Sequence, residues 1–124
     1  MKKLIRISAG EVSMAAELNN SQTAALIYDK LPLEGTVNTW GDEIYFKIPV
    51  ESGPEDAVEK VEIGDLAYWP DGQCFCIFFG KTPASTDSEI RPASPVNLIG
   101  RFTGNPDDWK KVHPGVGIKL QRGE

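Results

Sequence analysis

Six consecutive apolar residues, from Cys74 to Phe79, constrain the fold more than any other part of this sequence. Successive side chains of a β-strand point to opposite faces of its sheet, so a strand of this composition needs cover on both faces. The turn Pro70-Asp71-Gly72 and Gly80 bound the run, as turn residues bound a strand. We therefore expect a strand in the middle of a sheet that has material packed on each side.

Other segments alternate apolar and polar residues with the period of two that is typical of half-buried strands. The expected strands cover residues 4–7, 12–18, 36–40, 44–48, 63–69, 74–79, 96–102 and 117–121. Turn residues at 9–11 and 41–42 join neighbouring segments into hairpins. Helical spacing predicts a short amphipathic helix from Thr23 to Leu31, which Pro32 ends, and a helical turn over 106–111.

Length and composition favour one domain. The chain has 124 residues, of which 40% are hydrophobic and 25% charged, and this suits a single folded domain over residues 1–124. Around eight short strands with few helices predict a mainly β fold. We expect a closed, antiparallel, eight-stranded β-barrel with one or two short helices, because closure removes exposed sheet edges.

Charge limits the partners of the chain. The formal net charge is -5 and the 13 basic residues are scattered, which disfavours nucleic acid and an anionic membrane surface as partners. Arg6 and Glu11 interrupt the N-terminal segment too early for a signal peptide, and no stretch reaches the ~18 apolar residues of a membrane span. We expect a cytoplasmic monomer or small homo-oligomer whose partner is a peptide, a small ligand or a protein.

Cys74 and Cys76 are the two cysteines, and their spacing places both side chains on one face of a strand. Such neighbours are poorly placed for a disulfide, whose Cβ atoms come within ~4 Å of each other. The spacing also differs from that of a zinc site, and His113 is the single histidine. We expect free, buried, inert thiols, and we assign no metal and no cofactor. A nucleophile that pairs a cysteine with His113 stays open, without support from the spacing.

Three stretches of the chain form a recognisable set: Val12–Pro32, Gln73–Thr82 and Val96–Phe102. Read in order, they resemble the cyclophilins over nearly the whole chain. The chain resembles still more closely a family of small prokaryotic cyclophilin-like proteins, which has a known fold and no settled activity. That likeness rests on Trp40–Phe46, Ala67–Pro70, Phe78–Pro83 and Pro92–Asn97. The implied fold is the cyclophilin-like barrel.

Cyclophilins isomerise X-Pro peptide bonds in a groove outside the barrel, and the resemblance allows their groove residues to be matched one by one. Their arginine falls at Phe46, with Lys47 beside it. Their glutamine, phenylalanine, histidine and tryptophan fall at Cys74, Cys76, Val96 and near Arg91. Every matched position departs from the family pattern. The resemblance therefore implies the barrel without the usual prolyl isomerase residues.

A groove of this kind is expected to retain an aromatic surface with one cation, which suits an extended peptide or a flat small ligand. The ligand-binding side chains we predict are Tyr45, Phe46, Tyr68, Trp69, Cys76 and Arg91. Barrel core is the competing interpretation of these aromatics, and it applies least to Trp69, which meets an exposed turn. Asp42 and Glu43 are neighbours on a strand that point to opposite faces, so we expect turn and surface residues, not an acid/base pair.

Three functions stay open at this point. The first is a binding domain that uses the aromatic outer groove. The second is a divergent peptidyl-prolyl cis-trans isomerase with Lys47 or Arg91 as the cation. The third is a subunit of a larger enzyme assembly. No catalytic residue is assigned, and whether the chain is an enzyme is left undecided.

Overall fold

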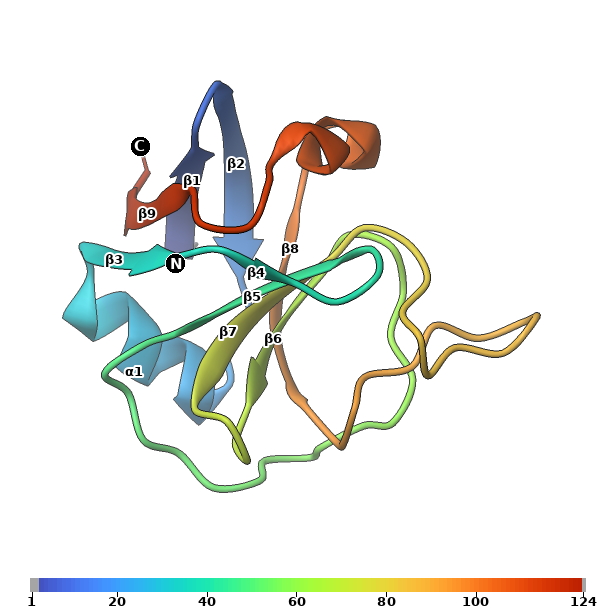
Figure 1. The fold of residues 1–124 in the computed structure, drawn as a ribbon. Helices are drawn as coiled ribbons and strands as arrows, with labels where there is room; N and C mark the ends of the chain where they lie inside the picture. Colours follow the sequence, from blue (N-terminus) through green and yellow to red (C-terminus); the bar gives the residue numbers. More distant parts are fainter. Residues whose placement is uncertain (1–2, 124) are drawn as a thin grey trace.

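One nine-stranded antiparallel sheet makes up most of the computed structural model, which describes residues 3–123 (Figure 1). Its elements are β1 (Lys3–Ala9), β2 (Val12–Leu18), α1 (Gln22–Lys30), β3 (Leu33–Thr36), β4 (Asn38–Thr39), β5 (Glu43–Lys47), β6 (Asp65–Trp69), β7 (Cys74–Phe78), β8 (Asn97–Phe102), the 3-10 helix η1 (Pro106–Lys111) and β9 (Gly117–Arg122). Residues 1, 2 and 124 of the expected domain lie outside the described part. Over residues 3–123, neither helix has the length and apolar composition needed to cross a membrane.

The sheet curls into a nearly closed barrel. Its strand order is β3-β9-β1-β2-β8-β6-β7-β5-β4, so the first and last strands are neighbours in the chain, separated only by Val37. The Val37 N–H donates to the Val116 carbonyl at 2.9 Å, which ties this seam to the segment before β9. The predicted mainly β barrel is confirmed. It has nine strands instead of eight because β3 pairs with β9 while β4 pairs with β5.

The predicted hairpins and helix follow from local sequence. Gly10 and Gly41 occupy turns with φ of 58° and 62°, a left-handed conformation that glycine adopts without steric cost. These turns connect β1 to β2 and β4 to β5. Helix α1 begins after Ser21, whose Oγ accepts from the Ala24 N–H at 3.1 Å, and it ends at Lys30. The predicted positions of these elements are confirmed to within a few residues.

Strand β7 separates two hydrophobic clusters. All five of its residues are buried, with Phe75 and Ile77 in the barrel interior. The outer cluster consists of Val61, Ala67, Cys74, Cys76, Phe78 and Val96, with Tyr45, Val58, Trp69, Ile90 and Leu98 packed against it. The connections 48–64 and 79–96 contribute to this outer cluster, and the bridge Val58 to Val96 joins them. The predicted two-sided burial of this strand is confirmed.

A buried polar network fixes the first of these connections to helix α1. The Asn97 side chain, only 1% exposed, accepts from the Glu55 N–H at 2.8 Å and donates to Thr23 Oγ1 at 3.1 Å and to the Gly53 carbonyl at 3.0 Å. The Glu55 carboxylate in turn accepts from the N–H groups of Gln22 and Thr23, both at 2.9 Å. Those N–H groups belong to the first turn of the helix and have no partner within it. The connection and the helix therefore stabilise each other.

Candidate functional site

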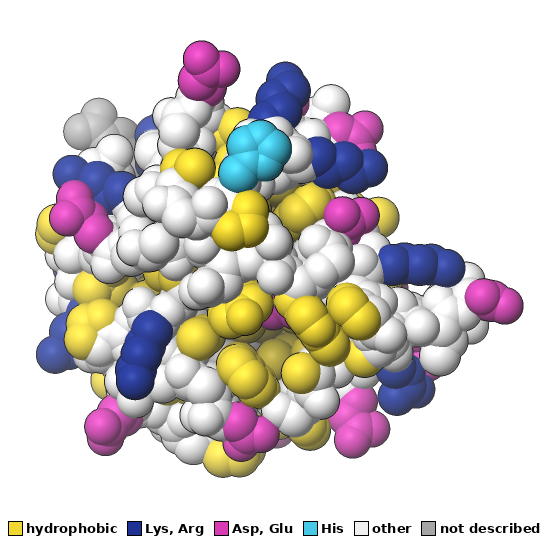
Figure 2. All heavy atoms as spheres, viewed as in Figure 1, with side chains coloured by type: hydrophobic (Ala, Val, Ile, Leu, Met, Phe, Trp, Pro, Cys, Tyr) yellow, Lys and Arg dark blue, Asp and Glu magenta, His cyan; other side chains and the backbone are white. Residues whose placement is uncertain are grey.

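A cavity of about 230 Å³ lies on the outer face of the barrel, beside the outer hydrophobic cluster. It is lined by Trp40, Glu43, Tyr45, Trp69 and Ala93. In Figure 2, hydrophobic side chains gather on the face where β5, β6 and β7 lie in Figure 1. Three of the lining residues are aromatic and one is acidic. Among residues 3–123, no lysine, arginine or histidine belongs to the lining.

Strand alternation aims two cavity residues outward. Glu43 and Tyr45 lie two positions apart on β5 and share its outer face, whereas Ile44 points into the core. Trp40 stands just before the hairpin turn, where its N–H donates to the Glu43 carbonyl at 2.9 Å. The Asp42 N–H donates to the Lys81 carbonyl at 2.8 Å, which fixes the hairpin against the end of β7. The cavity wall on this side is therefore held by backbone hydrogen bonds.

The Trp69 indole is held by a chain of hydrogen bonds. Its Nε1–H donates to Ser94 Oγ at 2.5 Å, and that hydroxyl donates to Asp71 Oδ2 at 2.7 Å. The ring also packs against Gly72, where an added Cβ would lie 2.3 Å from ring carbons. Trp69 thus spans the gap between the β6–β7 turn and the connection before β8. The sequence predicted Trp69 to be only partly buried, and the structure confirms this.

Glu43 is the residue that the sequence interpretation missed. It was expected at the surface, but only 6% of it is exposed, so that expectation was wrong. Burial raises the pKa of its carboxyl to about 7, and the side chain of Cys76 opposes this rise. On the outer face of β5 it shares the cavity lining with three aromatic side chains and with Ala93 of the connection before β8. The sequence did contain a signal for this placement, because Glu43 stands two positions before Tyr45 on the same strand and therefore shares its face.

Six residues were predicted to bind a ligand, and the structure places them in different parts of the protein. Tyr45 and Trp69 line the cavity. Cys76 shares the outer face but is 1% exposed. Phe46 and Tyr68 belong to the interior core, which corrects their predicted place in the groove. Each is the strand neighbour of a cavity residue, so it points to the other face.

Phe46 and Tyr68 have structural partners inside the barrel. The rings of Phe46 and Phe75 pack with their centroids 5.4 Å apart. The Tyr68 hydroxyl donates to the Val50 carbonyl at 2.6 Å, and burial raises the pKa of this phenol. Both side chains are at most 1% exposed. They stabilise the wall that supports the cavity without reaching the cavity itself.

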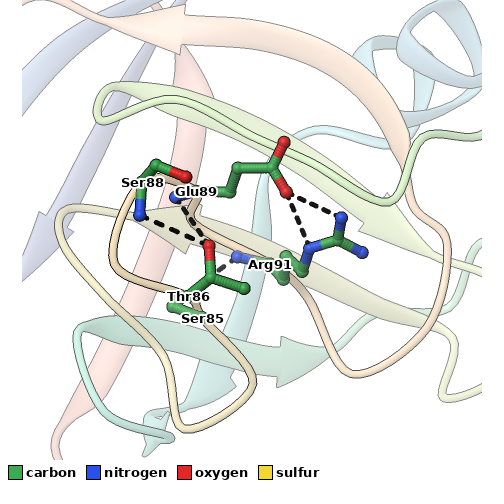
Figure 3. A network of polar contacts seen from close by, with 5 residues as sticks. All are labelled: Ser85, Thr86, Ser88, Glu89 and Arg91. Carbon is green, nitrogen blue, oxygen red and sulfur yellow. Dashed lines mark hydrogen bonds and ion pairs between the residues drawn. The ribbon is translucent and has the colours of Figure 1, made fainter.

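Arg91 does not line the aromatic cavity but an adjoining hollow of about 390 Å³, which shares Ala93 with the cavity and is also lined by Pro92 and Glu59. Its Nε and Nη2 donate to Glu89 Oε1 at 3.0 and 2.7 Å (Figure 3). The hydrogen bonds from Arg91 hold the pKa of the Glu89 carboxyl below its usual value. The Arg91 N–H donates to Ser85 Oγ at 3.1 Å. Arg91 therefore shapes the connection between β7 and β8.

Cys74 and Cys76 are free and buried, as predicted. Burial raises the pKa of both thiols, and the nearby Glu43 carboxyl raises them further. A thiol with a raised pKa holds little thiolate, which is the nucleophilic form. His113 is exposed beyond η1 and is not part of the cavity lining. Among residues 3–123, no three His, Cys, Asp or Glu side chains are grouped to hold a metal ion.

Thiol labelling tests this burial. With Ellman's reagent at pH 8, we expect both cysteines of the native protein to react at least about 100-fold more slowly than in guanidinium, where both react. The unfolded sample is the internal control, because it contains the same two thiols. Rapid release of one equivalent of chromophore from the native protein would contradict the buried placement of Cys74 and Cys76.

Comparisons with known proteins agree on the fold. A sequence profile of a family described as cyclophilin-like matches residues 3–121. The solution structure of a hypothetical protein from Archaeoglobus fulgidus is similar, with a TM-score of 0.83 and 39% identity over 98% of this chain and 95% of that one. McbB in complex with tryptophan has a TM-score of 0.66 and 12% identity over 97% of this chain and 45% of that one. No curated protein matches this chain.

Proposed function

This chain belongs to the cyclophilin-like family, and from that premise we propose that it is a binding domain that takes a small ligand, or one side chain of a peptide, in the aromatic cavity of its outer face. The observation that carries the proposal is the lining of Trp40, Tyr45 and Trp69 around one buried carboxyl. Small-molecule sites are mostly apolar and aromatic, with a few polar groups that orient the ligand. The cavity has this composition.

The preorganised position of Trp69 also supports the proposal. Its indole is fixed by Ser94 and Asp71 before any ligand arrives. A side chain that is already ordered loses little conformational entropy on binding. The size of the cavity, about 230 Å³, lies below the ~300 Å³ at which sites for drug-sized ligands begin. We therefore propose a compact ligand.

A thermal-shift screen combined with two cavity variants tests the proposal. Any ligand that binds only the native state raises its apparent stability. We expect a hit on the wild type to bind at least about tenfold more weakly to Trp69→Ala, which removes a wall, and to Ala93→Leu, which fills the cavity. Trp fluorescence provides a second readout, because Trp40 and Trp69 line the cavity.

The matched control is Ile63→Ala, which changes an exposed residue outside the lining. It is expected to leave ligand affinity unchanged. Ala93 is itself exposed, so Ala93→Leu keeps the core intact even if Trp69→Ala is destabilised. Equal affinity of a hit for the wild type, Trp69→Ala and Ala93→Leu would contradict the proposed cavity.

Divergent prolyl isomerisation has less support from the geometry. That reaction needs a hydrogen-bond donor near the prolyl nitrogen, and neither candidate cation lines the aromatic cavity. Arg91 pairs with Glu89, and Lys47 is exposed on β5. An exchange assay on a proline peptide at high protein concentration tests this function, and acceleration lost in Arg91→Ala would revive it. No specific observation favours the role of a subunit in a larger enzyme.

A further inference from the structure

The cavity combines two features that select for charge. Three of its five lining residues are aromatic, and the faces of aromatic rings attract cations, while its one acidic residue is only 6% exposed. Over residues 3–123, the lining offers a ligand no basic side chain. A neutral ligand would leave the buried Glu43 carboxylate without a countercharge, and an anionic ligand would face repulsion from it. Electrostatic complementarity therefore favours a positive ligand.

The hydrogen-bonding capacity of the lining limits which cation fits. A primary ammonium has three N–H donors, and each needs an acceptor when water is removed. The side-chain hydrogen-bond acceptors of the lining are the Glu43 carboxyl and the Tyr45 hydroxyl, because the two tryptophans offer only N–H donors and the alanine offers neither. An N-methylated ammonium has few or no N–H donors to satisfy. Its methyl groups instead contact the aromatic faces, where the cation–π attraction strengthens as water is excluded.

Resting on the proposed function, we propose that the cavity formed by Trp40, Tyr45, Trp69 and Glu43 binds a small N-methylated ammonium compound, with the aromatic rings around the methyl groups and the Glu43 carboxylate as the countercharge. The cavity volume of about 230 Å³ suits one compact head group. Among the groove residues matched from the resemblance, Phe46 and Arg91 supply no part of this charge selection, because Phe46 lies in the core and Arg91 lines the adjoining hollow.

The same carboxyl makes binding depend on pH. The titratable side chains around it are Tyr45 on β5, Cys76 and Cys74 on β7, and Asp42 in the adjoining turn. Only the ionised Glu43 attracts a cation, and burial sets its pKa at about 7. Both thiols have raised pKa values and stay neutral below pH 8. Affinity is therefore expected to rise about tenfold from pH 6 to pH 8, following the ionised fraction.

Three probes that share a 2-hydroxyethyl group separate the effect of charge from that of methylation. Choline carries the N-methylated cation, 3,3-dimethyl-1-butanol is its neutral carbon isostere, and ethanolamine is the unmethylated cation. Titration at pH 8 is followed by the fluorescence of the cavity tryptophans, Trp40 and Trp69. We expect choline to bind at least about tenfold more tightly than either other probe.

Two variants test whether the Glu43 carboxylate is responsible for choline affinity and for its pH dependence. Glu43→Gln keeps the side-chain shape and removes the charge, so it is expected to lose at least about tenfold in choline affinity and to lose the pH dependence. Glu11→Gln removes one charge from an exposed turn outside the cavity lining and is expected to bind choline as the wild type does. The unfolding midpoint of each variant, measured without ligand, verifies that it is folded.

Each contrary result has a distinct meaning. Equal binding of choline and its neutral isostere would overturn the cation inference and leave the proposed binding function standing. Ethanolamine binding as tightly as choline would overturn the methylated class. Absence of choline binding at pH 8 would overturn the inference altogether, while the thermal-shift screen on Trp69→Ala and Ala93→Leu tests the proposed function separately.

Discussion

The Glu43→Gln variant is expected to exceed the wild type in free energy of unfolding by about 3 kcal/mol at pH 8.5, and to match it near pH 4. Burial raises the pKa of the Glu43 carboxyl from 4.5 to about 7 in the native state. Between those values the native protein binds more protons than the unfolded chain, so the contribution of Glu43 to stability falls as pH rises. Glutamine does not titrate and escapes this loss.

Guanidinium unfolding of both proteins at pH 4, 5.5, 7 and 8.5 measures this difference. Other titrating groups, including Glu55 and Glu89 with their lowered pKa values, act on both proteins and cancel. Glu11→Gln is the control, because its exposed carboxyl is expected to give a difference within about 0.5 kcal/mol at every pH. A difference between Glu43→Gln and the wild type that stays constant from pH 4 to 8.5 would disprove the buried, pKa-shifted carboxyl.

The Asn97→Ala variant is expected to lose about 3 kcal/mol of stability. Asn97 makes three hydrogen bonds at 2.8 to 3.1 Å that join β8 to Thr23, Gly53 and Glu55. Its removal leaves the Glu55 N–H and the Gly53 carbonyl without these partners. The connection between β5 and β6 is expected to loosen together with the first turn of α1. Urea unfolding gives the loss, and amide hydrogen exchange at residues 22–24 locates it.

Asn38→Ala is the matched control for this prediction. Asn38 is exposed, and its amide donates two long hydrogen bonds of 3.4 and 3.5 Å to backbone carbonyls. The expected loss is within about 0.5 kcal/mol. Similar losses for the two variants would mean that the buried network at Asn97 contributes no more than an exposed contact.

The alternation of apolar and polar residues predicted the barrel because this pattern can be recognised within each short segment of the sequence. The two-sided burial of β7 could be foreseen from six apolar residues in succession, and the hairpin at Gly41 from a turn between alternating segments. The division of one expected strand into β3 and β4 could not be foreseen, because the break at Val37 arises from hydrogen bonds to residues near 116. That pairing depends on a contact between segments about 80 positions apart. Local sequence patterns contain no information about such a distant contact.

The site was predicted only in part. Adjacent residues were assigned to one groove at 45–46 and at 68–69, although the alternation used to define the strands places such neighbours on opposite faces. Tyr45 and Trp69 line the cavity, and Phe46 and Tyr68 fill the core. Burial on both faces hid which member of each pair points outward. Glu43 was missed because its burial depends on tertiary packing, which brings Trp69 and Ala93 to the same cavity from distant parts of the sequence.

The cavity has two kinds of wall, and they differ in how freely they can change during evolution. Glu43, Tyr45 and Trp69 stand on strands whose other faces fill the barrel. Ala93 stands on the connection between β7 and β8, where it is exposed and contributes nothing to the core. Substitution at this position alters the room available to a ligand at little cost in stability. Under the proposed binding function, homologues with the same barrel are therefore expected to diverge in ligand preference through a single loop position.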